Sequence, residues 1–227
     1  MPVIVRGMAI SHNCTHLALL AKDTGAGDFE EMSLMDGSHM TPEMLKVNPW
    51  HQIPNMSDGD LNLGESGAIL RYIANKYAPD KYGGSDSAKK ATIDWALEWM
   101  SANFGKVRSR APLARDSFLS DRTSCADRIP APHCPQKDFQ NLWYPVAGFG
   151  PAPADQAAAN KQALENLETF ASVFLLGPGK FVGGFAEPSI ADYLIAVKMH
   201  CIGVPAIKAK VGVLASYVTP SLALQPP

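Results

Sequence analysis

The spacing of apolar residues along this sequence changes near residue 80, and that change restricts the folds that the chain can adopt. Residues 3–77 alternate between short β-rich runs and amphipathic segments with helical spacing, whereas the apolar segments after residue 86 show helical spacing alone. Strands that alternate with helices are typical of an α/β unit, and a sustained helical period is typical of helix-on-helix packing. The sequence therefore predicts an α/β unit followed by an all-α unit.

The first 77 residues predict the element order βαβαββα. The expected strands are residues 3–9, 29–35, 53–57 and 61–63, and the expected helices start near residues 14, 41 and 66. Glycine, proline and Asp-Gly signals separate these elements, and the last two strands form a hairpin across Asp58-Gly59-Asp60. Ser66 is expected to cap the third helix, whose apolar face carries Ile69, Leu70, Ile73 and Tyr77.

The second part of the chain predicts helices near residues 93–104, 156–176 and 190–201. The last of these opens on Ser189-Ile190-Ala191-Asp192, a variant of the capping box. No regular structure is assigned to residues 109–153, which are rich in Pro, Ser and Asp. The predicted domains are residues 1–78 and 87–227, joined by a linker at 79–86 with a polar, glycine-rich composition.

Charge and composition exclude several classes of protein. With 20 basic and 22 acidic side chains the net charge is −2, which argues against a nucleic-acid-binding protein. No apolar run approaches the ~20 residues that span a bilayer, and the N-terminus lacks the plan of a signal peptide. The four cysteines (Cys14, Cys125, Cys134 and Cys201) lack metal-ligand spacing. We therefore expect a cytoplasmic protein with no metal and no membrane partner.

The most informative stretch, Asn48-Pro49-Trp50-His51-Gln52-Ile53-Pro54, precedes the predicted hairpin. Proline pushes the residue before it into the β region, and a cis Ile53-Pro54 bond would turn the Ile53 N–H and C=O outward. Such an open backbone edge can pair with an extended peptide. Further along, Ser66 at a helix N-terminus offers N–H groups to a carboxylate, and Glu65 can accept an ammonium group. Together these residues predict a site for a small zwitterionic peptide.

The element order, the Asn48–Pro54 stretch, the Glu65-Ser66 pair and the helical second half resemble the cytosolic glutathione transferases. Within that family, the Ser11-x-x-Cys14 start and the Asn48–Pro54 stretch look most like the delta/epsilon branch. The resemblance covers residues 3–77 and resumes over residues 181–201. It implies a thioredoxin-like α/β domain that binds glutathione and an all-helical domain that holds an apolar electrophile.

The resemblance also implies roles for individual residues. Ser11 falls where this branch keeps a catalytic serine, whose hydroxyl donates to the glutathione sulfur. His51 would bind the glycine end of glutathione, Gln52 would also bind glutathione, and the Ile53 backbone would pair with the cysteinyl unit. Glu65 and Ser66 would bind the γ-glutamyl end. Glutathione would be a co-substrate, conjugated to an apolar electrophile or used to reduce a peroxide, and the protein would be a homodimer.

Other interpretations stay open at this point. Gly67 stands where arginine is common in the delta branch, so the fold could serve as a non-catalytic module that binds ligands or partners. Cys14, three residues after Ser11, could instead act as a thiol transferase. Ser11 could be only a helix cap, and Asp192 is expected to be structural.

Two further sets of residues have a structural and a functional interpretation. The aromatic and sulfur-containing residues near the start of the helical part can belong to the core or line the electrophile pocket; these are Trp99, Met100 and Phe104. A metal site is the weaker interpretation of Cys125, His133 and Cys134, because a proline-rich loop offers only these three ligands.

Overall fold

Four short strands form a mixed sheet in the order β2-β1-β3-β4. The computed structural model describes residues 2–104, 154–175 and 181–202. Its elements are β1 (Val3–Gly7), α1 (His12–Asp23), β2 (Gly27–Glu31), η1 (Ser38–Met40), α2 (Pro42–Val47), β3 (Asn55–Asp58), β4 (Leu61–Gly64), α3 (Ser66–Tyr77), η2 (Pro79–Tyr82), α4 (Ser87–Phe104), α6 (Gln156–Phe174) and α7 (Ile190–Ile202). The predicted order βαβαββα is confirmed, as is the helical character of the second part.

The sheet pairs β1 in parallel with β2, and β3 antiparallel to both β1 and β4. Burial alternates along β1, so that Val3 and Val5 face the core while Ile4 and Arg6 are half-buried. Helices α1 and α3 bring fully buried leucine and isoleucine side chains to that core. The period-2 pattern of the strand and the 3.6-residue pattern of the helices thus meet in one apolar layer.

The second strand lies earlier in the chain than the sequence predicted. It runs over Gly27–Glu31 instead of residues 29–35 because its pairing with β1 ends where Gly7 opposes Glu31. The strand also starts on a required glycine, since a Cβ at Gly27 would lie 1.8 Å from the carbonyl oxygen of Val3. Beyond the strand the chain leaves the sheet, and Met35 is 86% exposed.

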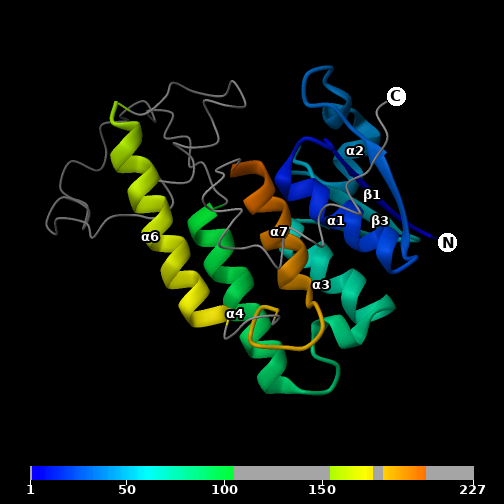
Figure 1. Cartoon of the computed structure of the whole chain (residues 1–227). Helices are drawn as coiled ribbons and strands as arrows, with labels where there is room; N and C mark the ends of the chain where they lie inside the picture. Colours follow the sequence, from blue (N-terminus) through cyan, green and yellow to red (C-terminus); the bar gives the residue numbers. More distant parts are fainter. Residues whose placement is uncertain (1, 105–153, 176–180, 203–227) are drawn as a thin grey trace, which may run out of the picture.

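Helices α4, α6 and α7 lie on one side of the molecule, and the sheet with α1–α3 lies on the other (Figure 1). Trp99 of α4 packs on Phe170 of α6 with ring centroids 5.0 Å apart, and Met100 is fully buried. These contacts support the core interpretation of Trp99 and Met100. The side chain of Phe104 lies outside the described residues.

The capping box predicted at Ser189 is formed as expected. The Asp192 carboxylate accepts from the Ser189 N–H at 2.7 Å, from the Ser189 hydroxyl at 2.8 Å and from the Val182 N–H at 3.0 Å. Ser189 and Asp192 are both buried. The structural role expected for Asp192 is therefore seen directly, and it extends to the turn that precedes α7.

The stretch with linker composition contains an ordered turn. Residues 79–82 form η2, and the buried Tyr82 donates its hydroxyl hydrogen to Asp94 of α4 at 2.9 Å. One apolar cluster continues from the sheet through α1 and α3 into α4, α6 and α7. The described parts of the chain therefore share a single core. None of their helices is long and apolar enough to cross a membrane.

Candidate functional site

Three segments named by the sequence analysis meet at one edge of the sheet. Arg6, near the end of β1, pairs with Asn55 at the start of β3, and Asn55 pairs with Gly64 at the end of β4. A Cβ on Gly7 would lie 3.8 Å from the Pro54 Cα, so the end of β1 contacts the turn before β3. This edge therefore gathers the loop that leads to Ser11, the Ile53-Pro54 turn and the Glu65-Ser66 start of α3.

Ser11 is the N-cap residue of α1, but its hydroxyl forms no capping bond. Its backbone is extended (φ −79°, ψ 117°), and its carbonyl oxygen accepts from the Cys14 and Thr15 N–H groups at 2.8 and 2.9 Å. The loop before it is held by Glu31, whose carboxylate accepts from the Ala9 N–H at 2.9 Å. The cap interpretation therefore fits the backbone of Ser11, while its half-buried side chain is not used for capping.

Cys14 lies in the first turn of α1 and is fully buried against β1. A Cβ on Gly7 would lie only 2.4 Å from its sulfur, so the glycine makes room for the thiol. Burial raises the pKa of the Cys14 thiol, and the neighbouring Ser11 hydroxyl offsets this only in part. A buried, protonated thiol is a poor nucleophile, which argues against the thiol-transferase interpretation.

The loop over Trp50–Gln52 is organised by Asn48, which is buried. The Asn48 side chain donates to the Gln52 carbonyl oxygen at 2.9 Å and accepts from the Trp50 N–H at 3.1 Å. Its backbone carbonyl oxygen accepts from the His51 N–H at 3.2 Å. Asn48 also lies against β4, because a Cβ on Gly64 would be 3.1 Å from its Nδ2 atom. The sequence analysis quoted Asn48 within the motif but gave it no role; its place at a helix end, before a proline, was the available signal.

The Ile53-Pro54 peptide bond is cis, which is the condition stated above for an Ile53 backbone that can pair with an extended peptide. Ile53 is half-buried and lies just before β3. Among the described residues, none forms a hydrogen bond with the backbone N–H or C=O of Ile53. Its backbone thus offers one donor and one acceptor at the sheet edge.

Helix α3 begins one residue earlier than a Ser66 cap would require. Glu65 is the N-cap residue, with φ 61° and ψ 115°, and Ser66 is the first helical residue. The Glu65 carbonyl oxygen accepts from the Ala68 and Ile69 N–H groups at 3.0 and 3.1 Å. The N–H groups of Ser66 and Gly67 therefore stand at the open N-terminus of the helix, where anions bind favourably.

His51 and Glu65 share an uncommon backbone conformation. In the described ranges they are the two non-glycine residues with positive φ, at 56° and 61°. For side chains other than glycine this region costs about 1–3 kcal/mol, and such residues cluster at functional sites. Both had been assigned to the ligand site from the sequence, so the observed strain falls on predicted site residues.

Two buried polar atoms outside α1 have no hydrogen-bond partner within the part of the chain that is described. They are the Asn55 Oδ1 atom at the start of β3 and the His39 Nδ1 atom in η1. A ligand or an ordered water can satisfy such atoms. The sequence analysis singled out neither residue, because an isolated Asn or His shows no periodic signal.

No group of three metal-ligating side chains occurs in residues 2–104, 154–175 or 181–202. The weak metal hypothesis for Cys125, His133 and Cys134 concerns residues outside those ranges.

Residues 4–75 match the family profile described as the N-terminal domain of glutathione S-transferase. Glutathione S-transferase 4 of Zea mays is 42% identical over 98 residues, which cover 42% of this chain and 44% of the relative. The chain thus spans less than half the length of this relative. Glutathione S-transferase theta-1 of Mus musculus is 32% identical over 199 residues, covering 86% of this chain and 71% of the relative.

Solved structures agree on the fold. A delta-class glutathione transferase of Nilaparvata lugens has a TM-score of 0.70 and 22% identity, covering 96% of this chain and 89% of that one. The thioredoxin-like α/β part followed by helices is therefore confirmed. The relatives include a theta enzyme and the structures include a delta enzyme, so the delta/epsilon branch stays a prediction.

Proposed function

Because the chain belongs to the glutathione S-transferase family, we propose that it conjugates the thiol of glutathione to apolar electrophiles. One observation carries the proposal: a single sheet edge gathers the cis Ile53-Pro54 turn, the start of α3 and the loop that leads to Ser11. Each of these offers a different part of what an extended γ-glutamyl tripeptide needs.

Glutathione would lie along this edge in an extended conformation. The Ile53 N–H and C=O would pair with its cysteinyl unit, as in strand addition. The N–H groups at the start of α3, with Ser66, would bind the γ-glutamyl carboxylate, and Glu65 would accept from the ammonium group. His51 and Gln52, held by Asn48, would bind the glycine end.

Ser11 would act on the sulfur. A free thiol has a pKa of about 8.5, so only ~3% is ionised at pH 7. A hydrogen bond from the Ser11 hydroxyl and the N-terminus of α1 both favour the thiolate. A decrease of ~1.5 in the thiol pKa, about 2 kcal/mol, would raise the ionised fraction to roughly half.

The chemical step follows from that ionisation. The thiol proton passes to solvent, and the sulfur lone pair forms a bond to the electrophilic carbon. The leaving group departs with its bonding electron pair, so no metal and no covalent enzyme intermediate is needed. Catalysis then rests on an activated nucleophile and on proximity. Reduction of peroxides by the same thiolate is a second activity to be tested.

The remaining parts of the proposal concern the whole molecule. We place the glutathione domain in residues 1–78, the linker in 79–86 and the electrophile domain in 87–227. Homodimers are typical of the family, and we propose the same here, with the protein in the cytoplasm. Both domains contribute to one apolar core, which supports their action as a unit.

Calorimetric titration with glutathione at pH 7.5–8 tests the binding step, and conjugation of a chloronitrobenzene tests the chemistry. Binding with turnover is expected. Cysteinylglycine, which lacks the γ-glutamyl unit, serves as the matched ligand and should bind at least about tenfold more weakly. Binding without turnover would favour the non-catalytic module, and no heat of binding at millimolar glutathione would refute the proposal.

A further inference from the structure

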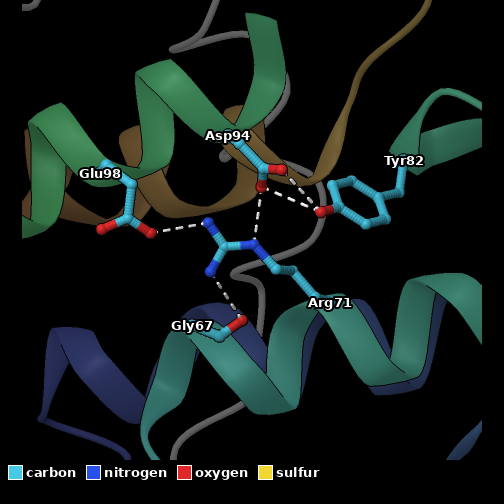
Figure 2. Close-up of polar contacts among 5 residues, drawn as sticks. All are labelled: Gly67, Arg71, Tyr82, Asp94 and Glu98. Atoms are coloured by element: carbon cyan, nitrogen blue, oxygen red, sulfur yellow. Dashed lines mark hydrogen bonds and ion pairs between the residues drawn. The ribbon is translucent and has the colours of Figure 1, made fainter. Parts of the chain in front are cut away.

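The guanidinium of Arg71 joins α3 to α4 (Figure 2). Its Nε atom donates to Asp94 Oδ1 at 2.6 Å, and its Nη2 atom donates to Glu98 Oε1 at 2.8 Å. The Tyr82 hydroxyl donates to the same Asp94 carboxylate at 2.9 Å. The side chains of Arg71 and Asp94 are 25% and 38% exposed, so their contact is partly shielded from solvent, whereas Glu98 is 70% exposed.

The same guanidinium reaches back to the first turn of α3. Its Nη1 atom lies 3.4 Å from the Gly67 carbonyl oxygen, to which it donates (Figure 2). A Cβ added at Gly67 would lie 3.1 Å from Nη1, closer than nine in ten real Cβ contacts, so the guanidinium would have to shift by a few tenths of an ångström. Gly67 and Arg71 therefore form a matched pair, because the missing side chain at one position leaves room for the guanidinium of the other.

The first turn held in this way carries Glu65 and Ser66. Glu65 has a positive φ, a conformation that persists only when its surroundings hold it. One cation opposes two carboxylates in the cluster, so Arg71 brings no net positive charge to the helix N-terminus. Its contribution to a bound anion would therefore come from geometry and not from charge.

We propose that Arg71 is a positioning residue for glutathione: it holds the first turn of α3 against α4 in the geometry that binds the γ-glutamyl end. This inference rests on the proposed function. It links the helical part of the chain to the glutathione site through a single side chain. The glutathione domain alone would lack Asp94 and Glu98, the two anchors of that side chain.

The first test compares Arg71→Met with Lys76→Met in the full chain. Lys76 is a matched control on the same helix, since it pairs with Asp58 at 2.5 Å but lies away from the first turn. Arg71→Met should raise the KM and Kd for glutathione about tenfold. Its kcat should change less than about twofold, and the dependence of kcat on pH should stay the same. Asp94→Asn should act in the same direction, and Lys76→Met should leave KM unchanged.

The second test introduces an arginine at residue 67, one helical turn before Arg71. Gly67→Arg alone should crowd Arg71 and raise the KM for glutathione by about fivefold or more. In the double variant Gly67→Arg/Arg71→Met the KM should be lower than the product of the two single effects predicts, because the crowding is gone. Should Arg71→Met fold poorly, Arg71→Lys keeps the charge but loses the two-pronged contact, and should raise KM without changing kcat.

These outcomes distinguish a failure of the proposed function from a failure of the role assigned to Arg71. Absence of glutathione binding by the wild-type protein refutes both the proposed function and this inference. Normal binding by the wild type, with an unchanged KM in Arg71→Met, refutes the inference alone. Equal loss of kcat and of glutathione affinity in Arg71→Met and in Lys76→Met also overturns it, because the effect would then reflect general stability of α3.

Discussion

At the scale of single residues, the site depends on side chains that hold the backbone as much as on those that would touch a ligand. Asn48 uses its carbonyl, its amide donor and its amide acceptor on three successive residues of the loop. Glu31 fixes the loop before Ser11 in a similar way. The groups proposed to bind glutathione are therefore set in place before a ligand arrives, which reduces the entropy lost on binding.

Removing the Ser11 hydroxyl gives the most direct test of the proposed chemistry. In Ser11→Ala, turnover should decrease by one to two orders of magnitude because the thiolate loses a hydrogen-bond donor, while glutathione still binds. Steady-state conjugation and calorimetry measure the two effects separately. Cys14→Ala is the control and should keep turnover within about threefold, since the buried thiol takes no part. Equal activity of Ser11→Ala and wild type would remove Ser11 from its role.

Asn48→Ala tests the support of the loop. The substitution leaves the Gln52 carbonyl and the Trp50 N–H without their side-chain partner, so the free energy of unfolding should decrease by about 1–3 kcal/mol. The KM for glutathione should increase more than kcat decreases. Asn62→Ala, whose exposed side chain accepts from Ser57, is the matched control and should cost less than about 1 kcal/mol. Denaturant unfolding and steady-state kinetics of both variants measure these two effects, and equal losses in Asn48→Ala and Asn62→Ala would contradict the role of Asn48.

At the scale of elements, the helices differ in how their N-termini are satisfied. Thr41 and Asp155 cap α2 and α6 with one side-chain bond each, to Met44 N–H at 3.3 Å and to Ala158 N–H at 2.9 Å. Asp192 serves α7 with three bonds in a buried setting. Among the described residues, no side chain hydrogen-bonds the N-terminus of α1 or of α3 as a cap. These two open helix starts are the ones proposed to act on glutathione, α1 near its sulfur and α3 at its γ-glutamyl carboxylate.

Caps of unequal burial should contribute unequally to stability. Asp155→Ala removes one exposed capping bond and should cost about 1 kcal/mol. Asp192→Ala leaves buried donors on Ser189 and Val182 without partners and should cost about 3 kcal/mol or more. Thermal and denaturant unfolding of the two variants, measured side by side, test this ranking. Similar losses in both would show that burial of the α7 cap has no energetic consequence.

At the scale of the whole molecule, the sheet and the helical part are joined by polar contacts as well as by the shared core. Tyr193 of α7 donates its hydroxyl hydrogen to Asp23 at the end of α1, and Lys81 pairs with the same carboxylate at 3.3 Å. Arg71 forms the second polar link.

Between α1 and α7 lie two histidines that are kept uncharged. Burial, with the charge of Lys198, lowers the pKa of His12 to about 3 and that of His16 to about 4.

These histidines make the stability sensitive to acid. Both have a pKa near 6.5 when unfolded, so below that pH the unfolded chain binds more protons than the folded one. Their contribution to stability is complete above pH 6.5 and decreases as the pH falls toward 4 and then 3. In His16→Phe the slope of unfolding free energy against pH between 6.5 and 4 should be about half that of the wild type. Exposed His51, changed to Asn, is the control; an unchanged slope in His16→Phe would contradict the assignment.

Much of this architecture was accessible from local patterns. Short β-rich runs and the helical spacing of apolar residues predicted the element order. Thr41, Asp58-Gly59 and Ser189 marked boundaries because caps and turns are set by neighbours in the chain. Boundaries set by pairing were missed. The second strand ends where β1 has no further partner, and the start of α3 shifts to Glu65, whose backbone takes a conformation rare for its residue type.

The sequence by itself determined the family, the order of elements and the residues expected at the glutathione site. Periodicity and short motifs record what each segment does within a few residues of itself. Only the tertiary structure revealed that Asn48 lies against Gly64 of β4 and that Arg71 joins two helices. Those roles depend on partners that are distant in the chain or hidden by burial. No local pattern encodes which side chains will meet once the helices pack.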